Sequence, residues 1–592
     1  MQMILTVATF TGRIAAAAGV GLLFCATYGA GYLSLHGDQL WIFQRVMGFT
    51  AVGVLLLFTL GRSGSIWAFR TLKSLDRWIL EYPARASIVL AIFVLGYFAL
   101  WCGVSFLRHY YFHSSYDLGI LNQVVWNTAQ GRFFARSIEV SHDLGDHVRP
   151  YLAVLSVFYL LIPSPYVLLT FQSFVLALSA WPLYRLAQRK FDSPAIGLLA
   201  AFCLLAYPPL GFLNRYDFHV EVLSIPLLIA AYERVDVGDL KNASLFMALA
   251  LFCKENLGLT VAALGIMAGF SYKQWRFGLS WALVGVAYSS IALLAVIPVF
   301  RGEPSDTLAR YHWLGDTPSE MLWSALSQPG FILQKIFTVE HMLTLLQLIA
   351  PLAFLPLLGL PALLPAVPTL MYNFLAEWPS QTGIYHHYMA PLIPFIPVSA
   401  VFGLHRLITK SWDGGFQNVM PTGGPAINQS VALGACMMLI AMLASWIYQN
   451  PVTGNASLLW RRVPEVIPMG KTAPVPMIWP NDSAIREGLR YVPRDVSLLT
   501  TANYAPHLSH RPWIEMIPRA PVSTLGPDAE ALFLNVRDLR WWSCDDYIDN
   551  LRAASLLNFG VIFYRDGVLL VQKDKGDVTK LKDLLDHWPG CK

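Results

Sequence analysis

Apolar runs close to 20 residues long recur along this chain, and they constrain its fold more than any other feature. A helix needs about 20 consecutive apolar residues to cross the hydrocarbon core of a bilayer. Hydrophobic residues make up 55% of the 592 residues and charged residues only 13%, about half the ~25% that is typical of a soluble domain. The chain is therefore predicted to be an integral membrane protein that crosses the bilayer many times.

About thirteen runs are predicted to span the bilayer. Eight are clear: 13–34, 41–60, 86–107, 165–187, 194–213, 279–300, 389–408 and 430–448. Five are shorter: 222–234, 242–253, 256–272, 341–357 and 359–375. The run 151–162 ends at Pro163 and is too short to span, so it is interpreted as re-entrant or interfacial.

One interruption inside the apolar sequence matters for function. Lys254-Glu255-Asn256 divides the stretch 242–272. A charge at the centre of a spanning helix costs about 2.5–3.5 kcal/mol on insertion scales. We therefore expect two spans with a break at the outer surface rather than one long helix.

Cations predict the orientation, because Lys and Arg concentrate in cytoplasmic loops. They form four groups: the loop 62–85, Arg185 with Arg189 and Lys190, Lys273 with Arg276, and Arg406 with Lys410. If all four groups face the cytoplasm, the N-terminus does too. The outer segments are then the loops 108–150, 214–221, 301–340 and 376–388, and everything after residue 449.

The character of the chain changes near residue 475. Short β-prone runs follow at 496–502, 531–536, 560–564 and 568–572, and helical spacing appears at 545–557 and 578–586. The predicted fold class is an all-α polytopic transmembrane bundle with a small C-terminal extracytoplasmic α/β domain. Its parts are 1–85, with two additional spans and a basic loop, the main transmembrane domain 86–449, and the linker and α/β domain 450–592.

Residues that can do chemistry concentrate in the predicted outer segments. The members are Asp117, Asp146 and His147 in the first loop, Arg215, Asp217, His219 and Glu221 in the second, Lys254 and Glu255 at the break, and His387 and Tyr388. An outward-facing active site explains why they share one face. For each residue alone the alternative stays open that it marks the interface or caps a helix.

In combination these motifs resemble a family of bacterial polytopic membrane proteins. The motifs are Tyr116-Asp117-Leu118-Gly119, Asn122-Gln123, Gly145-Asp146-His147, Asp217-Phe218-His219-x-Glu221, Lys254-Glu255-Asn256, His387-Tyr388 and the stretch 505–511. The likeness covers most of the chain from residue 86. That family is similar to the GT-C superfamily of membrane glycosyltransferases, which take sugars from polyprenyl-phosphate carriers.

The resemblance implies an active carboxylate in the first outer loop, which maps onto Asp117. Many GT-C enzymes carry an acidic pair there, whereas Leu118 follows Asp117 in this chain. The two spans before residue 86 are also not part of the usual GT-C core. The implied location is the inner membrane of a bacterium.

The predicted function is transfer of a sugar from a polyprenyl-phosphate carrier to an acceptor at the outer face. Asp117 is the expected catalytic base, with a pKa raised by partial burial. Lys254 and Arg215 are candidates for the donor phosphate. Hydrogen bonds to phosphate or sugar are expected from His147, His219, His387 and Tyr388. Support, or ligands for Mg or Mn, are expected from Asp146, Asp217, Glu221 and Glu255.

The expected partners are the bilayer, the lipid-linked donor and a glycan, lipid or protein acceptor, with no nucleic acid. The main alternative is a transporter or flippase of a lipid-linked or envelope precursor, because intramembrane charge also marks substrate pathways. Transporters often contain internal repeats, and we find no convincing repeat in this sequence. A third interpretation is an assembly or sensor protein in which the tail is the working part.

Overall fold

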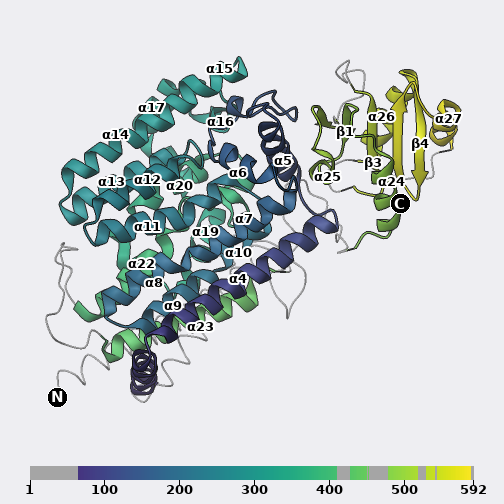
Figure 1. Ribbon diagram of the computed structural model, residues 1–592. Helices are drawn as coiled ribbons and strands as arrows, with labels where there is room; N and C mark the ends of the chain where they lie inside the picture. Colours follow the sequence, from purple (N-terminus) through teal and green to yellow (C-terminus); the bar gives the residue numbers. More distant parts are fainter. Residues whose placement is uncertain are drawn as a thin grey trace, which may run out of the picture.

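The computed structural model describes residues 64–409, 427–449, 451–452, 478–517, 529–539 and 543–587. The predicted spans 13–34 and 41–60, Lys410 and most of the linker before residue 478 lie outside these ranges. The described chain is a helical bundle with a small α/β domain at one end (Figure 1). This arrangement confirms the mostly helical architecture and the C-terminal sheet.

Five helical segments are long and apolar enough to cross a membrane. They are α4 (Ala84–Tyr110), α7 with α8 (Pro165–Leu178 and Ala180–Phe191), α14 to α15 (Trp275–Arg301), η7 with α20 (Leu355–Ala366 and Val367–Leu375) and α23 (Gln429–Tyr448). Two bent pairs raise the number to seven: α9 (Pro194–Leu205) with α10 (Pro208–Arg215), bent by 44°, and α18 (Pro329–Ile336) with α19 (Val339–Ile349), bent by 59°. The count of thirteen stays a prediction.

Shorter helices occupy several other predicted spans. These are α11 (Ser224–Asp236), α12 (Leu240–Leu251), α13 (Leu257–Tyr272) and α22 (Phe395–Thr409). The predicted break between α12 and α13 is confirmed, because the helices stop on either side of Lys254 and Glu255. The run 151–162 forms only the nine-residue helix α6 (Tyr151–Tyr159), which is too short to span a bilayer.

Facing glycines bring α13 and α14 (Trp275–Ile291) into close contact. A Cβ added to Gly265 would lie 2.6 Å from the carbonyl oxygen of Gly278, and Gly258 faces Gly285 in the same way. Small residues allow the backbones of membrane helices to approach closely, where dispersion and weak polar contacts hold them together. The two helices therefore pack closely directly after the Lys254 break.

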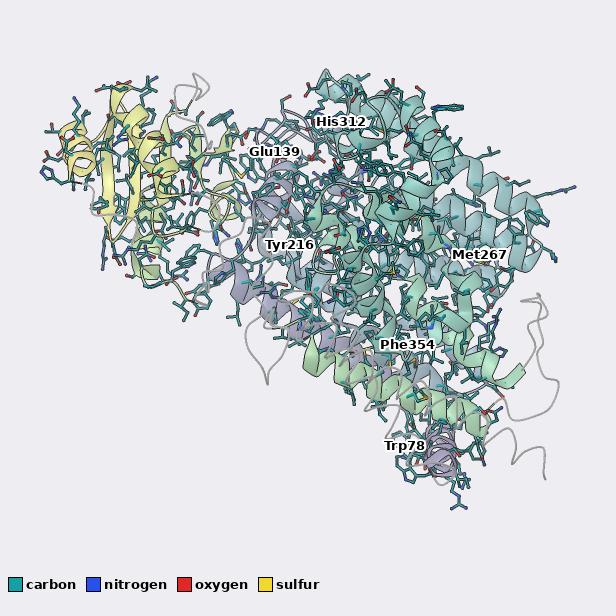
Figure 2. All side chains as sticks on the ribbon, turned by 180° about the vertical axis from the view of Figure 1, so that it is seen from behind. Trp78, Glu139, Tyr216, Met267, His312 and Phe354 are labelled. Carbon is teal, nitrogen blue, oxygen red and sulfur yellow. The ribbon has the colours of Figure 1, made fainter. Side chains whose placement is uncertain are left out.

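The cations of α8 gather at one end of the bundle, which we call the basic end. Lys190 Nζ lies 2.6 Å from Asp236 Oδ1, and Arg189 pairs with Glu233 and Asp236 of α11. Asp76, in the helix 64–81, accepts from the Ser193 hydroxyl at 2.8 Å. Trp78 marks this end in Figure 2, and Glu139 and His312 mark the opposite one.

The C-terminal domain is a five-stranded mixed sheet in the order β2-β1-β3-β5-β4. The strands are β1 (Leu498–Thr500), β2 (Ile514–Met516), β3 (Ala531–Asn535), β4 (Phe559–Arg565) and β5 (Val568–Lys573), with helices α24 (Asp482–Tyr491), α25 (Ala505–Leu508), α26 (Cys544–Leu556) and α27 (Val578–Asp586). Asp566 and Gly567 both have positive φ, as a type I′ hairpin turn requires. The four predicted strands and two predicted helices are confirmed; β2, α24 and α25 were not predicted.

The C-terminal domain docks on α5 (Tyr116–Ala129) in the first predicted outer loop. Asn122 donates to the Ser509 hydroxyl at 2.7 Å, and Gln123 donates to the Arg511 carbonyl at 3.1 Å. A Cβ on Gly119 would lie 2.9 Å from Ala505 Cβ, so glycine permits the close approach. The segment 505–511 is therefore one docking element of the domain.

Candidate active site

Asp117 lies in the first turn of α5, a helix that Figure 1 shows away from the basic end. One carboxylate oxygen accepts from the Ser115 hydroxyl at 3.2 Å and the Tyr216 hydroxyl at 3.1 Å. The same oxygen lies 3.8 Å from His219 Nε2. A negative charge at a helix N-terminus is further stabilised by the helix dipole. The sequence therefore places an anion where several donors converge on it.

The surroundings of Asp117 correct the expectation of a raised pKa. Burial raises the pKa of this carboxyl, but His219, Tyr216 and Ser115 outweigh burial and leave the pKa below its ordinary value. Hydrogen bonds to the charged form favour ionisation. Asp117 is therefore a carboxylate at neutral pH and is ready to accept a proton.

Asp217 lies beside Asp117, and its pKa is shifted in the opposite direction. Its carboxylate accepts the Ser115 backbone N–H at 2.7 Å, and its backbone φ is +117°. The conformation is held by Gln172 of α7, which donates to the Asp217 carbonyl at 2.8 Å and accepts the His219 N–H at 2.9 Å. Burial raises the pKa of Asp217 to about 6, with the Arg108 cation opposing the shift. The strained turn thus presents Tyr216 and His219 to Asp117.

His219 and His387 form an imidazole stack next to Asp117. Their ring centroids lie 3.9 Å apart and their planes differ by 13°. Both ring nitrogens of His219, Nδ1 of His387 and Oε2 of Glu221 are buried without a hydrogen-bond partner in the part of the chain that the structure describes. An unsatisfied buried polar atom costs about 1–3 kcal/mol. Four of them in one place indicate a site that a bound molecule or ordered water completes.

Glu221 joins this stack to the break between α12 and α13. Its Oε1 accepts from Lys254 Nζ at 3.0 Å and lies 3.4 Å from His387 Nε2. Burial raises the pKa of Glu221, but Lys254 and His219 outweigh burial and lower it to about 2. Burial lowers the pKa of Lys254, but Glu221 and Glu255 keep it above its ordinary value. The two groups therefore form a buried ion pair.

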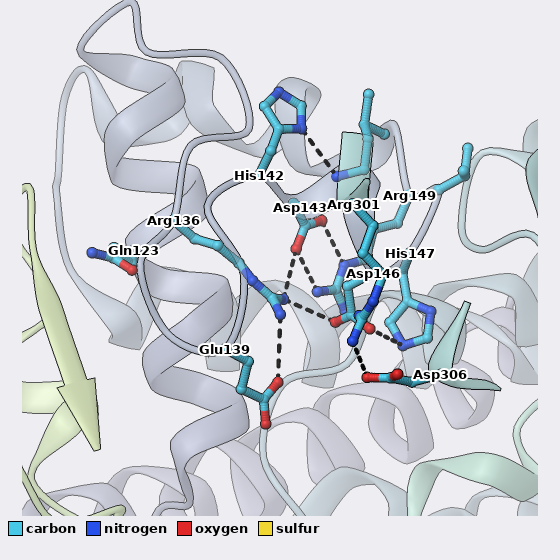
Figure 3. A network of polar contacts seen from close by, with 12 residues as sticks. Gln123, Arg136, Glu139, His142, Asp143, Asp146, His147, Arg149, Arg301 and Asp306 are labelled. Atoms are coloured by element: carbon cyan, nitrogen blue, oxygen red, sulfur yellow. Dashed lines mark hydrogen bonds and ion pairs between the residues drawn. The ribbon is translucent and has the colours of Figure 1, made fainter. Parts of the chain in front are cut away.

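A second ionic network continues from Glu255 through the first predicted outer loop. Figure 3 shows the part of this network that lies in the loop, around Arg136, Asp143 and Asp146. Glu255 accepts from His147 Nδ1 at 2.9 Å, and His147 Nε2 lies 3.7 Å from Asp146. Asp146 accepts from Arg136 at 2.9 Å. Asp143, which is fully buried, accepts two hydrogen bonds from Arg149 and one from Arg136. These ion pairs fix the loop over the site.

The structure thus brings together residues from all four sequence clusters. Asp117 lies next to His219, and His147 pairs with Glu255. Glu221 joins Lys254 to His387. Tyr388 lies on the same side, where its ring contacts His387 at 4.1 Å. Arg215 ends α10 one residue before Tyr216 and is half-buried. The chemical role of each residue stays a prediction.

Several polar residues of the cluster were not predicted from the sequence. Tyr216 and Ser115 both donate to Asp117. Arg136 and Arg149 hold Asp143. Tyr216 directly precedes the Asp217 motif, so it could have been predicted as part of that motif. No local sequence pattern points to a role for Arg136 or Arg149. Arg310 was also missed, and its guanidinium lies 5.6 Å from the Tyr388 ring centroid.

Binding of Mg or Mn by Asp146, Asp217, Glu221 and Glu255 stays a prediction. Within the described ranges, no group of three or more His, Cys, Asp and Glu side chains is arranged to hold a metal ion. The carboxylates instead pair with cations or with backbone and hydroxyl donors. We therefore derive no chemical step through a metal.

Bundle, docked domain and polar cluster together define a polytopic helical membrane protein with a buried ionic site at one end. The chain belongs to the family described as "Predicted membrane protein (DUF2079)", which matches residues 108–570. No curated protein matches it.

Solved structures offer more distant likenesses. ArnT from Cupriavidus metallidurans bound to undecaprenyl phosphate has 13% identity, covers 84% of this chain and 98% of its own, and gives a TM-score of 0.42. The apo state of the same protein has 14% identity, covers 82% of this chain and 98% of its own, and gives a TM-score of 0.44. The Archaeoglobus fulgidus oligosaccharyltransferase complex with Zn and sulfate has 13% identity, covers 82% of this chain and 73% of its own, and gives a TM-score of 0.37.

Proposed function

We propose that this protein is a membrane glycosyltransferase that moves a sugar from a polyprenyl-phosphate carrier to an acceptor at the outer face. The observation that carries the proposal is the group of unpartnered atoms on His219, His387 and Glu221, next to the ionised Asp117. A carboxylate beside imidazole nitrogens that have no partner suits proton transfer and hydroxyl recognition. The resemblance of the same motifs to the GT-C superfamily gives the donor class.

Asp117 is the proposed catalytic base. Its carboxylate takes the proton of the acceptor hydroxyl while the acceptor oxygen bonds to the anomeric carbon of the donor sugar. The bond between that carbon and the phosphate oxygen breaks, and its electron pair leaves with the polyprenyl phosphate. The side chain of Asp117 is 21% exposed, so an acceptor can reach it. Positioned proton transfer of this kind contributes about 10²–10⁴-fold to a rate.

The departing phosphate requires hydrogen-bond donors and positive charge. Lys254 supplies a point charge, which Glu221 holds in place at 3.0 Å, and Arg215 supplies a planar guanidinium at the end of α10. Burial and the neighbouring His219 and Lys254 lower the pKa of His387 well below its ordinary value. His387 is therefore neutral and can offer one N–H to the sugar or phosphate.

Comparison of cells with and without the protein tests this function. Mass spectrometry of the envelope glycans and of the lipid-linked sugars would show which pool changes. If the protein is a transferase, cells without it contain one glycan that lacks a sugar, and the matching polyprenyl-phosphate sugar accumulates in them. Unchanged glycans and lipid-linked sugars would contradict the proposal. A transporter would instead change the sidedness of a lipid-linked sugar while its structure stays the same.

A further inference from the structure

A second polar cluster lies at the basic end, far from Asp117. Glu233 of α11 is buried there with 1% of its side chain exposed, and three arginines surround it. Arg234 Nε lies 2.6 Å and Arg185 Nη2 lies 3.5 Å from its oxygens, and Arg189 is the third partner. Asp236 and Asp239 also pair with these arginines, and Lys190 adds a fourth cation. Four cations against three carboxylates leave the cluster with one excess positive charge.

Arg234 has one donor that the protein does not use. Its Nε pairs with Glu233, and its Nη1 lies 3.2 Å from Asp239. Its Nη2 is buried and has no hydrogen-bond acceptor among the residues that the structure describes. Arg185, by contrast, keeps 44% of its side chain exposed. An anion between the two would receive a charge-assisted hydrogen bond from each.

A cavity of about 430 Å³ opens beside these two arginines, between α8, α11 and α12. Its polar lining comes from Arg185, Glu233, Arg234 and Asn242. Most of its wall is apolar and comes from Trp181, Pro182, Pro226, Leu227, Ala230 and Phe246. Trp181 is 58% exposed, as is typical of aromatic residues at the headgroup level of a membrane.

We propose that this cavity binds an anionic phospholipid. The headgroup phosphate accepts from Arg234 Nη2 and from Arg185, and the upper parts of the acyl chains lie against Trp181 and Phe246. Free phosphate does not account for the apolar walls, and a neutral lipid does not account for the excess cations. Basic pockets between membrane helices at the cytoplasmic side commonly bind such headgroups. The basic end is the end predicted to face the cytoplasm, so the location agrees.

Native mass spectrometry of the purified full chain would test this site with phosphatidylglycerol and phosphatidylethanolamine as probes. Ala230→Trp fills the cavity without removing charge, and Arg185→Ala removes the exposed cation. Arg276→Ala is the matched control, because Arg276 is exposed in α14 and does not line the cavity. We expect both cavity variants to bind phosphatidylglycerol about tenfold more weakly, the scale of one lost charge-assisted contact, and the control to bind it as the wild type does.

Two results with the variants would overturn the proposal, and a third concerns the wild type. One is that Ala230→Trp retains phosphatidylglycerol as the wild type does. The other is that Arg276→Ala loses it as strongly as Arg185→Ala, which would show a diffuse charge effect. Equal affinity of the wild type for both lipids would overturn the selectivity for an anionic headgroup. Thermal unfolding of each variant in the same detergent verifies that binding is compared between folded proteins.

Discussion

Three side chains determine the state of the Asp117 carboxylate. Ser115 and Tyr216 donate hydrogen bonds to one oxygen, and His219 lies 3.8 Å from it. The sequence identified Asp117 and His219 but predicted the wrong direction for the pKa of Asp117. The reason is physical: partial burial was inferable from a loop next to a span, whereas two of the three partners, Tyr216 and His219, lie 99 and 102 positions away. Only the folded chain brings them together.

Asp117→Asn preserves shape and removes the charge and the proton acceptor. We expect sugar transfer to fall at least ~100-fold, the usual scale for a general base, while expression and folding persist. Asp316→Asn is the matched control, because the Asp316 side chain is 86% exposed in another predicted outer loop. Transfer from a polyprenyl-phosphate sugar by the two purified variants measures the effect. Near-wild-type transfer by Asp117→Asn would remove this residue from the mechanism.

Asp217→Asn tests the raised pKa of Asp217. The folded-state pKa of about 6 exceeds the unfolded value near 3.9, so the folded state binds more protons between these pH values. The wild type therefore loses free energy of unfolding as pH rises through this window, by up to ~3 kcal/mol. The Asn variant keeps an acceptor for Ser115 N–H and avoids this loss.

The expected result is a melting temperature in detergent that favours Asp217→Asn more at pH 7.5 than at pH 4.5. Other titrating groups are shared by both proteins and cancel in the difference. An identical difference at the two pH values would contradict the raised pKa.

At the scale of elements, α5 links the C-terminal domain to the candidate active site. Its first turn carries Asp117, and the following turns carry Gly119, Asn122 and Gln123, which contact the docking segment 505–511. The sequence predicted the strands with alternating or continuous apolar residues. It did not predict β2, which has three residues and pairs in parallel with β1, because such a strand exists only through its partner.

Gly119→Ala tests this link. The added methyl would lie 2.9 Å from Ala505 Cβ and about as close to its backbone, so the domain must shift, at a cost of about 1–3 kcal/mol for overpacking. We expect faster hydrogen exchange in 505–511 and lower sugar transfer. Gly103→Ala is the control, because a Cβ on Gly103 meets no atom within 4 Å. Unchanged exchange in Gly119→Ala would show that the contact is loose.

At the scale of the whole molecule, the structure separates two charged ends. Cations of α8 and acids of α11 lie at the basic end, and the candidate active site lies at the other. The sequence predicted this separation because clusters of Lys and Arg indicate the cytoplasmic face, and long apolar runs indicate the spans. It did not predict span lengths well, since several predicted spans are bent pairs or helices of 12 to 16 residues. At the candidate active site, hydrogen bonds and ion pairs compensate for the interruption of these helices.

Single-cysteine labelling tests the orientation. Ser74 in the basic loop and Lys582 on α27 are both exposed. Cys544 in the C-terminal domain is disulfide-bonded, and disulfides persist outside the reducing cytoplasm. We therefore expect an impermeant thiol reagent to label a cysteine at Lys582 in intact cells and one at Ser74 only after permeabilisation. The reverse pattern would contradict the proposed topology.

The central claim is that side chains from separate segments act as one catalytic site. Asp117 and His387 come from different predicted outer loops and are joined through His219, which stacks on His387. The most direct measurement is the rate of sugar transfer from a polyprenyl-phosphate sugar by the wild type, Asp117→Asn, His387→Asn and the double variant. Residues that act as a unit give non-additive losses. We predict that the double variant is no more than about threefold slower than Asp117→Asn alone. Losses that multiply, or a wild type that transfers no sugar, would contradict the account.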